Sequence, residues 1–264
     1  MEGYRPSTYG DRFADVYDDW YHDVSDVAAT VERIAGLAAA RDGRVLELGA
    51  GSGRLALPLA DRGLEVWAVD ASAAMLARLR AKPGARRVRA VVDDMADLRA
   101  PGLPATVGVV LCAFNTLFNL TDTAAQRSCL RRVHDLLAPG GCLLLEAFVP
   151  PPGGEADAVV SAVEPRHIGL DEVVLTVSRL DPATRTITGQ HVQITEAGVR
   201  LRPWVLHYAS PTELDALAAE AGLTLVERHA GWRGEPFAAG APVHVSRYDR
   251  LPAAAPEDPG EAIR

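Results

Sequence analysis

Short apolar runs alternate with longer helical patterns along the first 150 residues of this chain. The runs cover residues 45–48, 64–69, 88–92, 105–112 and 142–148. Runs of this length between turn-forming residues are typical of buried parallel strands. Helical periodicity covers residues 8–22, 24–39, 72–79 and 122–137. This alternation predicts an α/β fold with helices packed on both faces of a mostly parallel sheet.

The pattern changes over residues 171–209, where three β-rich runs are separated by turns. We expect them to form a small antiparallel β insertion of three strands after the fifth strand of the sheet. The main fold then resumes with a helix over residues 211–221 and with strands over residues 223–229 and 243–248. The composition of residues 251–264, rich in Ala, Pro and acids, predicts a disordered tail.

Three glycines at alternate positions, Gly49, Gly51 and Gly53, follow the first strand. Because glycine has no Cβ, they allow a sharp turn into the next helix, which Ser52 is expected to cap. Backbone N–H groups at such a helix start favour an anionic or carboxylate-bearing ligand, although a plain strand-to-helix connection is the alternative. A dinucleotide fingerprint requires Gly-x-Gly-x-x-Gly, but position 54 is Arg, so the spacing disfavours NAD.

Acidic residues stand at the ends of the second and third strands. Asp70 lies 17 residues beyond Gly53, and Asp93 and Asp94 follow the third strand. An acid at the end of the second strand can accept hydrogen bonds from both hydroxyls of a ribose. Asp70 can also begin the next helix, and the two roles are compatible. These acids and the glycine turn should lie at one edge of the sheet, where open α/β folds bind ligands.

The chain thus carries four segments of recognisable form: Glu47–Gly53, Asp70–Met75, Asp94–Met95 and Leu137–Gly141. Together they resemble the class I S-adenosylmethionine (SAM)-dependent methyltransferases, over about residues 9–150. The resemblance implies a Rossmann-like, seven-stranded, mostly parallel sheet, with SAM as the cofactor and S-adenosylhomocysteine as the product. The cofactor contacts that it implies are Tyr9, Glu47, Gly49, Ala50, Gly51, Gly53, Asp70, Ala71, Met75, Asp94, Met95, Ala113 and Phe114.

The first helical segment carries a broad aromatic stripe that includes Tyr9, Phe13, Trp20 and Tyr21. Such a stripe is often part of a core. It is also similar to the N-terminal lid of the methyltransferases, which implies that Tyr9 covers the methionine end of SAM and that Tyr21 lies on the acceptor side. The expected domains are this lid (residues 1–40), the SAM-binding core (41–150), a β lid insertion (151–209), the C-terminal part of the core (210–250) and the tail (251–264).

The loop after the fourth strand, residues 113–119, should leave the sheet beside the glycine turn. Asn115 and Asn119 can orient polar atoms of a methyl acceptor, or they can cap the turn before the next helix. Asn115 is not followed by Pro-Pro and an aromatic residue, the sequence typical of enzymes that methylate nucleic-acid bases. Trp204, in the insertion, is a further candidate for the acceptor pocket.

Two residues are candidate general bases, which the reaction needs only if the acceptor loses its proton early. Glu146 places a charge near the end of a buried strand, which is costly unless it is paired or faces a cleft; a structural hydrogen bond is the alternative. His207 precedes Tyr208 where the family tends to hold arginine, which implies a role in acceptor choice. Any single histidine of the insertion, His191 included, can also be an ordinary strand residue.

Composition adds limits on partners and location. The net charge of −8 disfavours a nucleic-acid partner. The absence of an apolar stretch of about 20 residues disfavours a membrane span, and we expect no secretory segment. Cys112, Cys129 and Cys142 are odd in number and lack metal-site spacing. We therefore expect no metal, and reduced core thiols in a cytoplasmic protein.

These observations predict a SAM-dependent methyltransferase that moves a methyl group by in-line displacement to an N, O or C atom. The expected acceptor is a small molecule, such as a secondary-metabolite intermediate, and the protein should be a monomer or a homodimer. Two alternatives stay open. One is an enzyme of the same fold that binds SAM or S-adenosylhomocysteine and catalyses a non-methylating rearrangement or cyclisation; the other is a non-enzymatic SAM-binding regulator.

Overall fold

A seven-stranded sheet forms the core of the computed structural model, which describes residues 1–150 and 158–251. The strand order is β10-β11-β5-β4-β1-β2-β3, and all neighbours are parallel except β11, which is antiparallel to β5 and to β10. The strands are β1 (Arg44–Leu48), β2 (Glu65–Asp70), β3 (Val88–Val92), β4 (Val107–Cys112), β5 (Leu137–Phe148), β10 (Leu223–His229) and β11 (Val243–Arg250). The predicted Rossmann-like architecture is confirmed.

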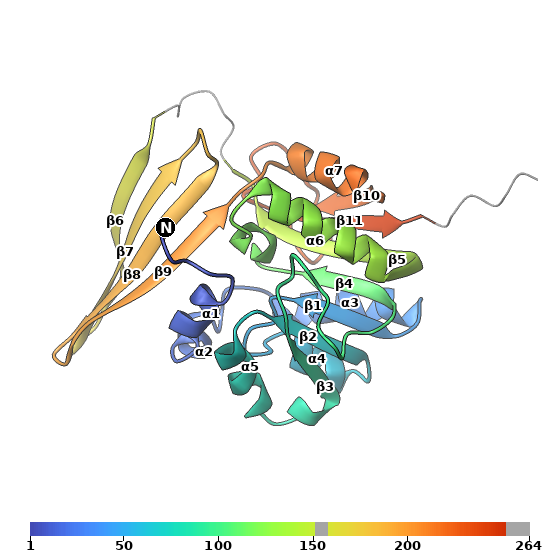
Figure 1. Ribbon diagram of the computed structural model, residues 1–264, viewed down its shortest axis with the longest axis horizontal. Coiled ribbons are helices and arrows are strands. Elements are labelled where there is room, and N and C mark those ends of the chain that lie inside the picture. The colour runs from blue at the N-terminus through green and yellow to red at the C-terminus, as the bar shows by residue number, and fades with distance from the viewer. Residues whose placement is uncertain (151–157, 252–264) are drawn as a thin grey trace, which may run out of the picture.

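Helices cover both faces of this sheet, as Figure 1 shows. They are α3 (Val27–Ala39), α4 (Ala56–Asp61), α5 (Ala73–Arg80), α6 (Thr123–Leu136) and α7 (Pro211–Glu220), with short 3₁₀ turns η1 (Ala85–Arg87) and η2 (Thr116–Asn119). In β1, Val45 belongs to the same buried cluster as α3, α4 and α5, while Leu46 and Leu48 belong to the cluster of α6 and α7. Successive side chains of a strand point to opposite faces, so the continuous apolar run of β1 is buried on both sides.

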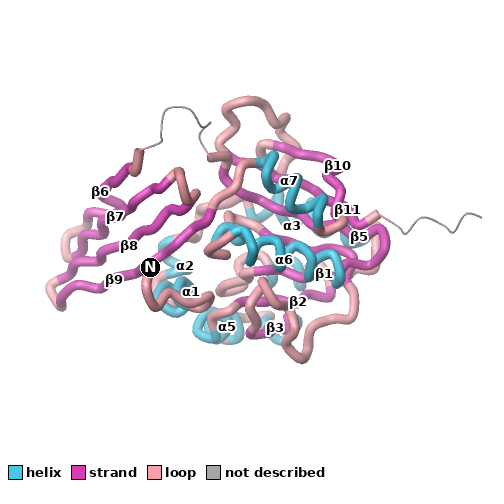
Figure 2. Tube along the Cα trace, turned by 45° about the horizontal axis from the view of Figure 1, so that its top comes forward, coloured by secondary structure: helices cyan, strands magenta, loops and turns pink. Residues whose placement is uncertain are grey.

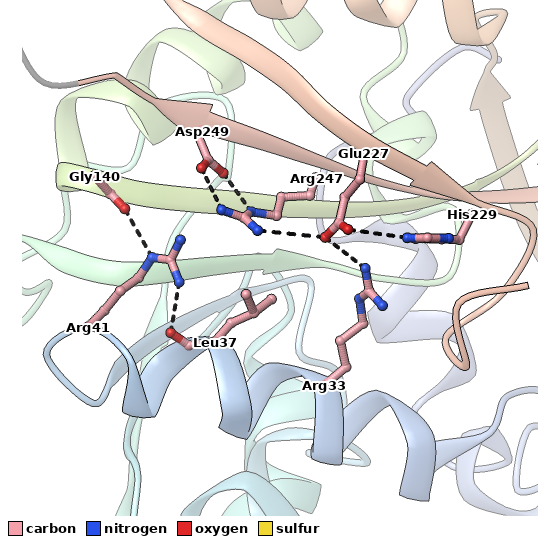
Figure 3. A network of polar contacts seen from close by, with 8 residues as sticks. All are labelled: Arg33, Leu37, Arg41, Gly140, Glu227, His229, Arg247 and Asp249. Atoms are coloured by element: carbon pink, nitrogen blue, oxygen red, sulfur yellow. Dashed lines mark hydrogen bonds and ion pairs between the residues drawn. The ribbon is translucent and has the colours of Figure 1, made fainter. Parts of the chain in front are cut away.

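A polar network fastens α3 to the antiparallel edge of the sheet (Figure 3). Nη2 of Arg33 in α3 donates to Oε1 of Glu227 in β10 at 2.8 Å. The guanidinium of Arg247, on β11, lies 3.7 Å from the same carboxylate. Arg41, just after α3, donates to the carbonyl oxygen of Gly140 at 3.0 Å. This network therefore holds the edge of the sheet, and none of its residues lines the cavity described below.

The insertion forms a separate antiparallel sheet in the order β6-β7-β8-β9. Its strands are β6 (Val160–Ile168), β7 (Glu172–Asp181), β8 (Thr186–Thr195) and β9 (Gly198–His207). The prediction of three strands is wrong because it misses β6, whose β pattern Pro165 interrupts. Since β6 is an edge strand, the missing N–H of Pro165 is tolerated, and the register shifts between Pro165 and His167.

The N-terminal segment folds as two short helices, α1 (Thr8–Phe13) and α2 (Tyr17–Trp20). The single helix predicted over residues 8–22 is therefore wrong in extent, and α3 begins three residues later than predicted, at Val27 rather than at residue 24. Figures 1 and 2 show α1 and α2 lying beside β9 and close to α5, between the antiparallel sheet and the core. We refer to α1 and α2 as the N-terminal cover.

Ion pairs attach the N-terminal cover to both neighbours. Asp15, in the break between α1 and α2, pairs with Arg202 of β9 at 2.5 Å, and Arg202 is only 1% exposed. Asp18 of α2 pairs with Lys82, just after α5, at 2.8 Å. Because the predicted helix breaks between α1 and α2, Asp15 pairs with β9 while Asp18 pairs with the residue after α5.

Other boundaries shift slightly. β4 begins at Val107 rather than at residue 105, and β5 extends back to Leu137. The predicted tail, apart from Leu251, lies outside the described residues. Within residues 1–150 and 158–251, no helix is long and apolar enough to cross a membrane. The division into five domains stays a prediction.

Candidate active site

A cavity of about 280 Å³ lies at the carboxyl ends of β1, β2, β3 and β4. The chain order reverses between the neighbouring strands β1 and β4, which is where open α/β sheets bind ligands. The sheet edge contributes Glu47, Leu48, Val69, Asp70, Asp93, Asp94 and Ala113 to the wall. The N-terminal cover, the residues just after it and the antiparallel sheet contribute Tyr9, Gly10, Tyr17, Tyr21, His191, Trp204 and Leu206. The cavity therefore lies between the core and two segments outside it.

The three glycines of the turn have different roles. All have positive φ, at +60° for Gly49, +55° for Gly51 and +85° for Gly53. Gly49 and Gly51 line the cavity, whereas Gly53 does not. A Cβ on Gly53 would lie 2.8 Å from Cγ of Leu79 in α5. Gly53, expected as a cofactor contact, thus lets α5 pack against the turn instead.

Ser52 does not cap a helix. Its Oγ donates a short hydrogen bond to Asp18 of the N-terminal cover, and α4 begins only at Ala56, after Leu55. Nζ of Lys82 donates to Oδ1 of Asp18 at 2.8 Å and to the carbonyl oxygen of Ser52 at 2.9 Å. The predicted cap is wrong because Leu55, three residues further on, is the N-cap residue of α4. The hydroxyl of Ser52 instead fastens the glycine turn to α2.

Asp70 fixes the glycine turn and also faces the cavity. Its Oδ2 accepts from the N–H of Gly51 at 2.8 Å, and its Oδ1 accepts from the N–H of Ser72 at 2.8 Å. Burial raises the pKa of Asp70, and the two N–H donors oppose that shift. Because each carboxylate oxygen has a second lone pair, Asp70 can still accept hydrogen bonds from hydroxyls in the cavity. Both roles predicted for this residue are compatible with the geometry.

Glu47 is a buried acid, 5% exposed, in the wall of the cavity. Among the described residues, its Oε2 has no hydrogen-bond partner. Burial raises the pKa of Glu47 to about 8, against the opposing effect of Arg54. A buried carboxylate oxygen without a donor is unstable as an anion, so a cationic ligand with N–H groups is the partner that this position lacks.

The acids after β3 organise their own loop. Oδ2 of Asp93 accepts from the N–H groups of Arg99 and Ala100, both at 2.7 Å. Oδ1 of Asp94 accepts from the N–H of Ala96 at 2.9 Å. Met75, Met95, Ala71 and Leu120 add apolar wall nearby. This part of the cavity offers flat apolar surface beside fixed carboxylates.

A group of aromatic rings also lines the cavity. Tyr17 and Tyr21 lie 5.0 Å apart between ring centroids, and Tyr21 lies 6.4 Å from Phe114 in an edge-to-face arrangement. Tyr9 stacks on buried Phe13 at 4.4 Å. The predicted acceptor-side residues Tyr21, Asn115, Asn119 and Trp204 all line the cavity. The structure therefore brings the expected cofactor contacts, Gly53 excepted, and the expected acceptor contacts into one space.

Asn115 has a structural function beyond the cavity wall. It adopts φ +61°, and its Oδ1 accepts from the N–H of Phe148 at 2.6 Å. Nδ2 of Asn119 donates to the carbonyl oxygen of Thr116 at 3.3 Å. Asn115 thus holds the loop to β5 and does not cap the η2 turn, whereas Asn119 closes that turn. Both residues also line the cavity, and their role toward the acceptor stays a prediction.

The two candidate bases lie outside the cavity. Oε2 of Glu146 accepts from the N–H of Phe114 at 2.8 Å, and burial raises the pKa of Glu146. Nε2 of His207 lies 2.9 Å from Oγ1 of Thr123 in α6. Neither residue lines the cavity. Glu146 positions the Phe114 backbone, and His207 joins β9 to α6.

Several lining residues were not predicted as site residues: Pro6, Gly10, Tyr17, Arg54, Asp93, Thr116 and His191. Tyr17 belongs to the predicted aromatic stripe and Asp93 directly precedes a predicted cofactor contact, so the sequence gives grounds for expecting both at the site. No sequence feature indicates that His191 lines the cavity, because its orientation depends on the register of β8 against β7 and β9.

Comparison with known proteins identifies the family. Residues 45–141 match the family model described as a methyltransferase domain. The solved structure of the CcbJ methyltransferase from Streptomyces caelestis is 40% identical, with a TM-score of 0.84, over 95% of this chain and 100% of that one. The chain belongs to the class I SAM-dependent methyltransferases. SAM is therefore the cofactor of this methyltransferase, as predicted.

Two further relatives of this methyltransferase are natural-product enzymes by name. Cypemycin N-terminal methyltransferase of a Streptomyces species is 28% identical over 250 residues, which cover 89% of this chain and 94% of that one. SAM-bound CalS10 is an amino pentose methyltransferase from Micromonospora echinaspora involved in calicheamicin biosynthesis. Its structure is 26% identical, with a TM-score of 0.63, over 89% of this chain and 97% of that one. The predicted natural-product tailoring type is confirmed.

The cavity of this methyltransferase fits SAM. The unpartnered buried oxygen of Glu47 suits the positive charge of the cofactor, and Asp70 suits its ribose hydroxyls. A Cβ on Gly51 would lie within 3.7 Å of the Tyr17 ring, so glycine keeps this part of the cavity open. When bound, SAM supplies a methyl group on a positively charged sulfur.

Proposed function

We propose that this methyltransferase transfers the methyl group of SAM to an amine nitrogen of a small natural product. The observation that carries the proposal is the aromatic part of the cavity wall, formed by Tyr17, Tyr21, Phe114 and Trp204 beside the glycine turn. Aromatic rings suit a compact, partly apolar acceptor, and their faces attract the positive charge that passes from the sulfonium to the amine nitrogen during transfer. The names of two relatives, an N-terminal methyltransferase and an amino pentose methyltransferase, support an amine acceptor.

Within this proposal, five residues would hold the cofactor: Glu47, Gly49, Gly51, Asp70 and Tyr9. Glu47 binds the amino group of SAM through its free Oε2, and Asp70 binds the ribose hydroxyls. The backbone of Gly49 and Gly51 would lie against the part of SAM between its amino group and its ribose. Tyr9 covers the methionine end, where its ring is fixed by stacking on Phe13.

The residues contribute mainly alignment. The nitrogen lone pair forms the new C–N bond as the C–S bond breaks, and the electron pair of that bond returns to sulfur. Holding donor and acceptor in line can lower the barrier by about 7–11 kcal/mol without covalent catalysis. We assign no base to this step, because neither Glu146 nor His207 lines the cavity. The new ammonium product releases its proton to water.

Transfer of an isotope-labelled methyl group from SAM to a panel of small amines tests this proposal. Each amine is paired with the alcohol of the same carbon skeleton, and products are read by mass. We expect labelled N-methyl products and unchanged alcohols. Labelling of the alcohols alone would contradict the choice of nitrogen. Conversion of an acceptor while the label stays on SAM would instead support the non-methylating alternative.

A further inference from the structure

His191 lies in the middle of β8, 7% exposed, on the face of the antiparallel sheet that is turned toward the N-terminal cover. Its ring is 5.6 Å from Phe13 and 5.8 Å from Trp20, between centroids. The strand register places Thr176 of β7 and Arg202 of β9 directly beside it. His191 therefore brings a polar group into an otherwise aromatic part of the cavity wall.

The two ring nitrogens of His191 have unequal partners. Nδ1 lies 3.0 Å from Oγ1 of Thr176, within normal hydrogen-bond distance. Nε2 lies 3.5 Å from Oη of Tyr21, at the long limit for such a bond. Both His191 and Tyr21 line the cavity. Nδ1 is thus hydrogen-bonded within the antiparallel sheet, while Nε2 has only a weak partner on the cavity side.

The surroundings keep the ring neutral. Burial, and then the guanidiniums of Arg166 and Arg202, lower the pKa of His191 to about 4. Arg166 reaches it from β6, where it stacks 4.9 Å from the Tyr21 ring centroid, and Arg202 is itself paired with Asp15. A neutral imidazole has one N–H and one lone pair. In the tautomer whose N–H is on Nδ1 and is directed to Thr176, the lone pair on Nε2 lies on the side of Tyr21 and the cavity.

We propose that His191 is an acceptor-binding residue, whose Nε2 accepts a hydrogen bond from an N–H of the methyl acceptor in place of the Tyr21 hydroxyl. The inference rests on the proposed amine methylation. The bond would direct the nitrogen lone pair away from His191 and toward the methyl group. Only the neutral amine has the lone pair that attacks the methyl group.

This assignment defines a substrate class. The acceptor must be a primary or secondary amine, because the hydrogen bond to Nε2 needs an N–H in the neutral form. A tertiary amine has none. We therefore expect methylation to stop at the tertiary amine, with no quaternary product.

Two substitutions separate the nitrogens of His191. The amide of His191→Gln reaches about as far as Nε2 and keeps a polar atom at the cavity, whereas the amide of His191→Asn replaces only Nδ1 and its contact with Thr176. We expect His191→Asn to lower kcat/KM for the amine about tenfold or more, mainly through KM, and His191→Gln to recover most of that loss. Both variants should bind SAM within about twofold of the parent affinity, as one lost acceptor contact leaves the cofactor end intact.

A binding experiment on the intact protein gives a readout that does not need turnover. With S-adenosylhomocysteine bound, ¹⁵N NMR of the His191 ring follows titration with aniline, which is neutral at neutral pH, and with N,N-dimethylaniline, which lacks an N–H. We expect an unprotonated Nε2 whose resonance shifts with aniline and not with the dimethyl compound. A proton on Nε2, no shift with aniline, or equal kinetics of the Asn and Gln variants would overturn the assignment. Failure of amine methylation by the parent protein would instead be seen in the labelled-methyl assay.

Discussion

Two acids at neighbouring strand ends behave differently because their donors differ. Asp70 accepts two backbone N–H bonds, at 2.8 Å each, and so belongs to the turn as well as to the cavity. Glu47 has a buried oxygen with no donor among the described residues. The first acid shapes the site before any ligand arrives, while the second depends on the ligand for its charge.

Replacing Asp70 tests its proposed contact with the ribose. We expect Asp70→Ala to weaken SAM binding by about 1–3 kcal/mol, because hydrogen bonds to a charged acceptor are lost. Isothermal calorimetry measures the change. Asp61→Ala is the matched control, since Asp61 is exposed and pairs with Arg87 away from the cavity. An unchanged affinity in Asp70→Ala would contradict the assignment.

Glu47 predicts a pH dependence. Burial raises the pKa of Glu47 to about 8 in the ligand-free protein. Between the usual glutamate pKa and pH 8, the folded protein therefore holds a proton that the unfolded chain has lost. The free energy of unfolding should fall as pH rises through this range. SAM binding should have the opposite trend, with affinity rising through the same range as the carboxylate ionises. Glu47→Gln should flatten both profiles, measured by denaturant unfolding and by calorimetry. Parallel profiles in the two proteins would exclude the role.

At the scale of elements, the N-terminal cover consists of two short helices that ion pairs attach to both of their neighbours. Arg202, buried in β9, donates to both oxygens of Asp15, at 2.5 Å and 3.0 Å, and to Oε1 of Gln193 at 2.8 Å. Arg200 also contacts Asp15, but it is exposed. A buried guanidinium depends on its counter-charge far more than an exposed one does.

This difference predicts unequal effects of two substitutions around one carboxylate. Asp15→Asn should destabilise the fold by about 1.5–3 kcal/mol, because a buried guanidinium loses its charged partner. Arg200→Ala should change stability by less than about 0.5 kcal/mol. Urea unfolding of both variants measures the two values. Equal effects would show that the Arg202 contact does not hold the cover.

The sequence predicts those elements that depend on local residue pattern, and it fails for those that depend on tertiary packing. The glycine turn, Asp70 and the core strands were predictable because period, spacing and composition are local. β6 was missed because Pro165 reads as a strand breaker unless its edge position is known. The functions of Glu146 and His191 depend on packing: Glu146 faces the Phe114 N–H rather than the cavity, and His191 faces the cavity only through the register of its sheet.

At the scale of the whole molecule, a ligand in the cavity would add contacts between the core and two segments packed against it. The cavity wall comes from the sheet edge, the N-terminal cover and the antiparallel sheet together. Family and cofactor could be predicted from the core sequence. The acceptor could not, since its pocket is built largely from the other two segments.

Ligand binding should therefore stabilise the whole fold. S-adenosylhomocysteine at about 100 times its Kd should raise the free energy of unfolding by about 2.7 kcal/mol and the Tm by roughly 5–10 °C. Thermal unfolding with and without ligand measures the shift. Asp70→Ala at the same ligand concentration should show a smaller shift in Tm. An identical shift would show that the ligand does not bind beside Asp70.

The N-terminal cover carries Tyr9, proposed to lie over the cofactor, and Tyr17, which lies in the aromatic acceptor wall with Tyr21 just after α2. Exchange of spent for fresh cofactor thus requires displacing part of the wall that holds the acceptor. An amine that receives two methyl groups should leave the protein between turnovers. Singly methylated product would then accumulate in solution first, and successive methylation would be distributive rather than processive.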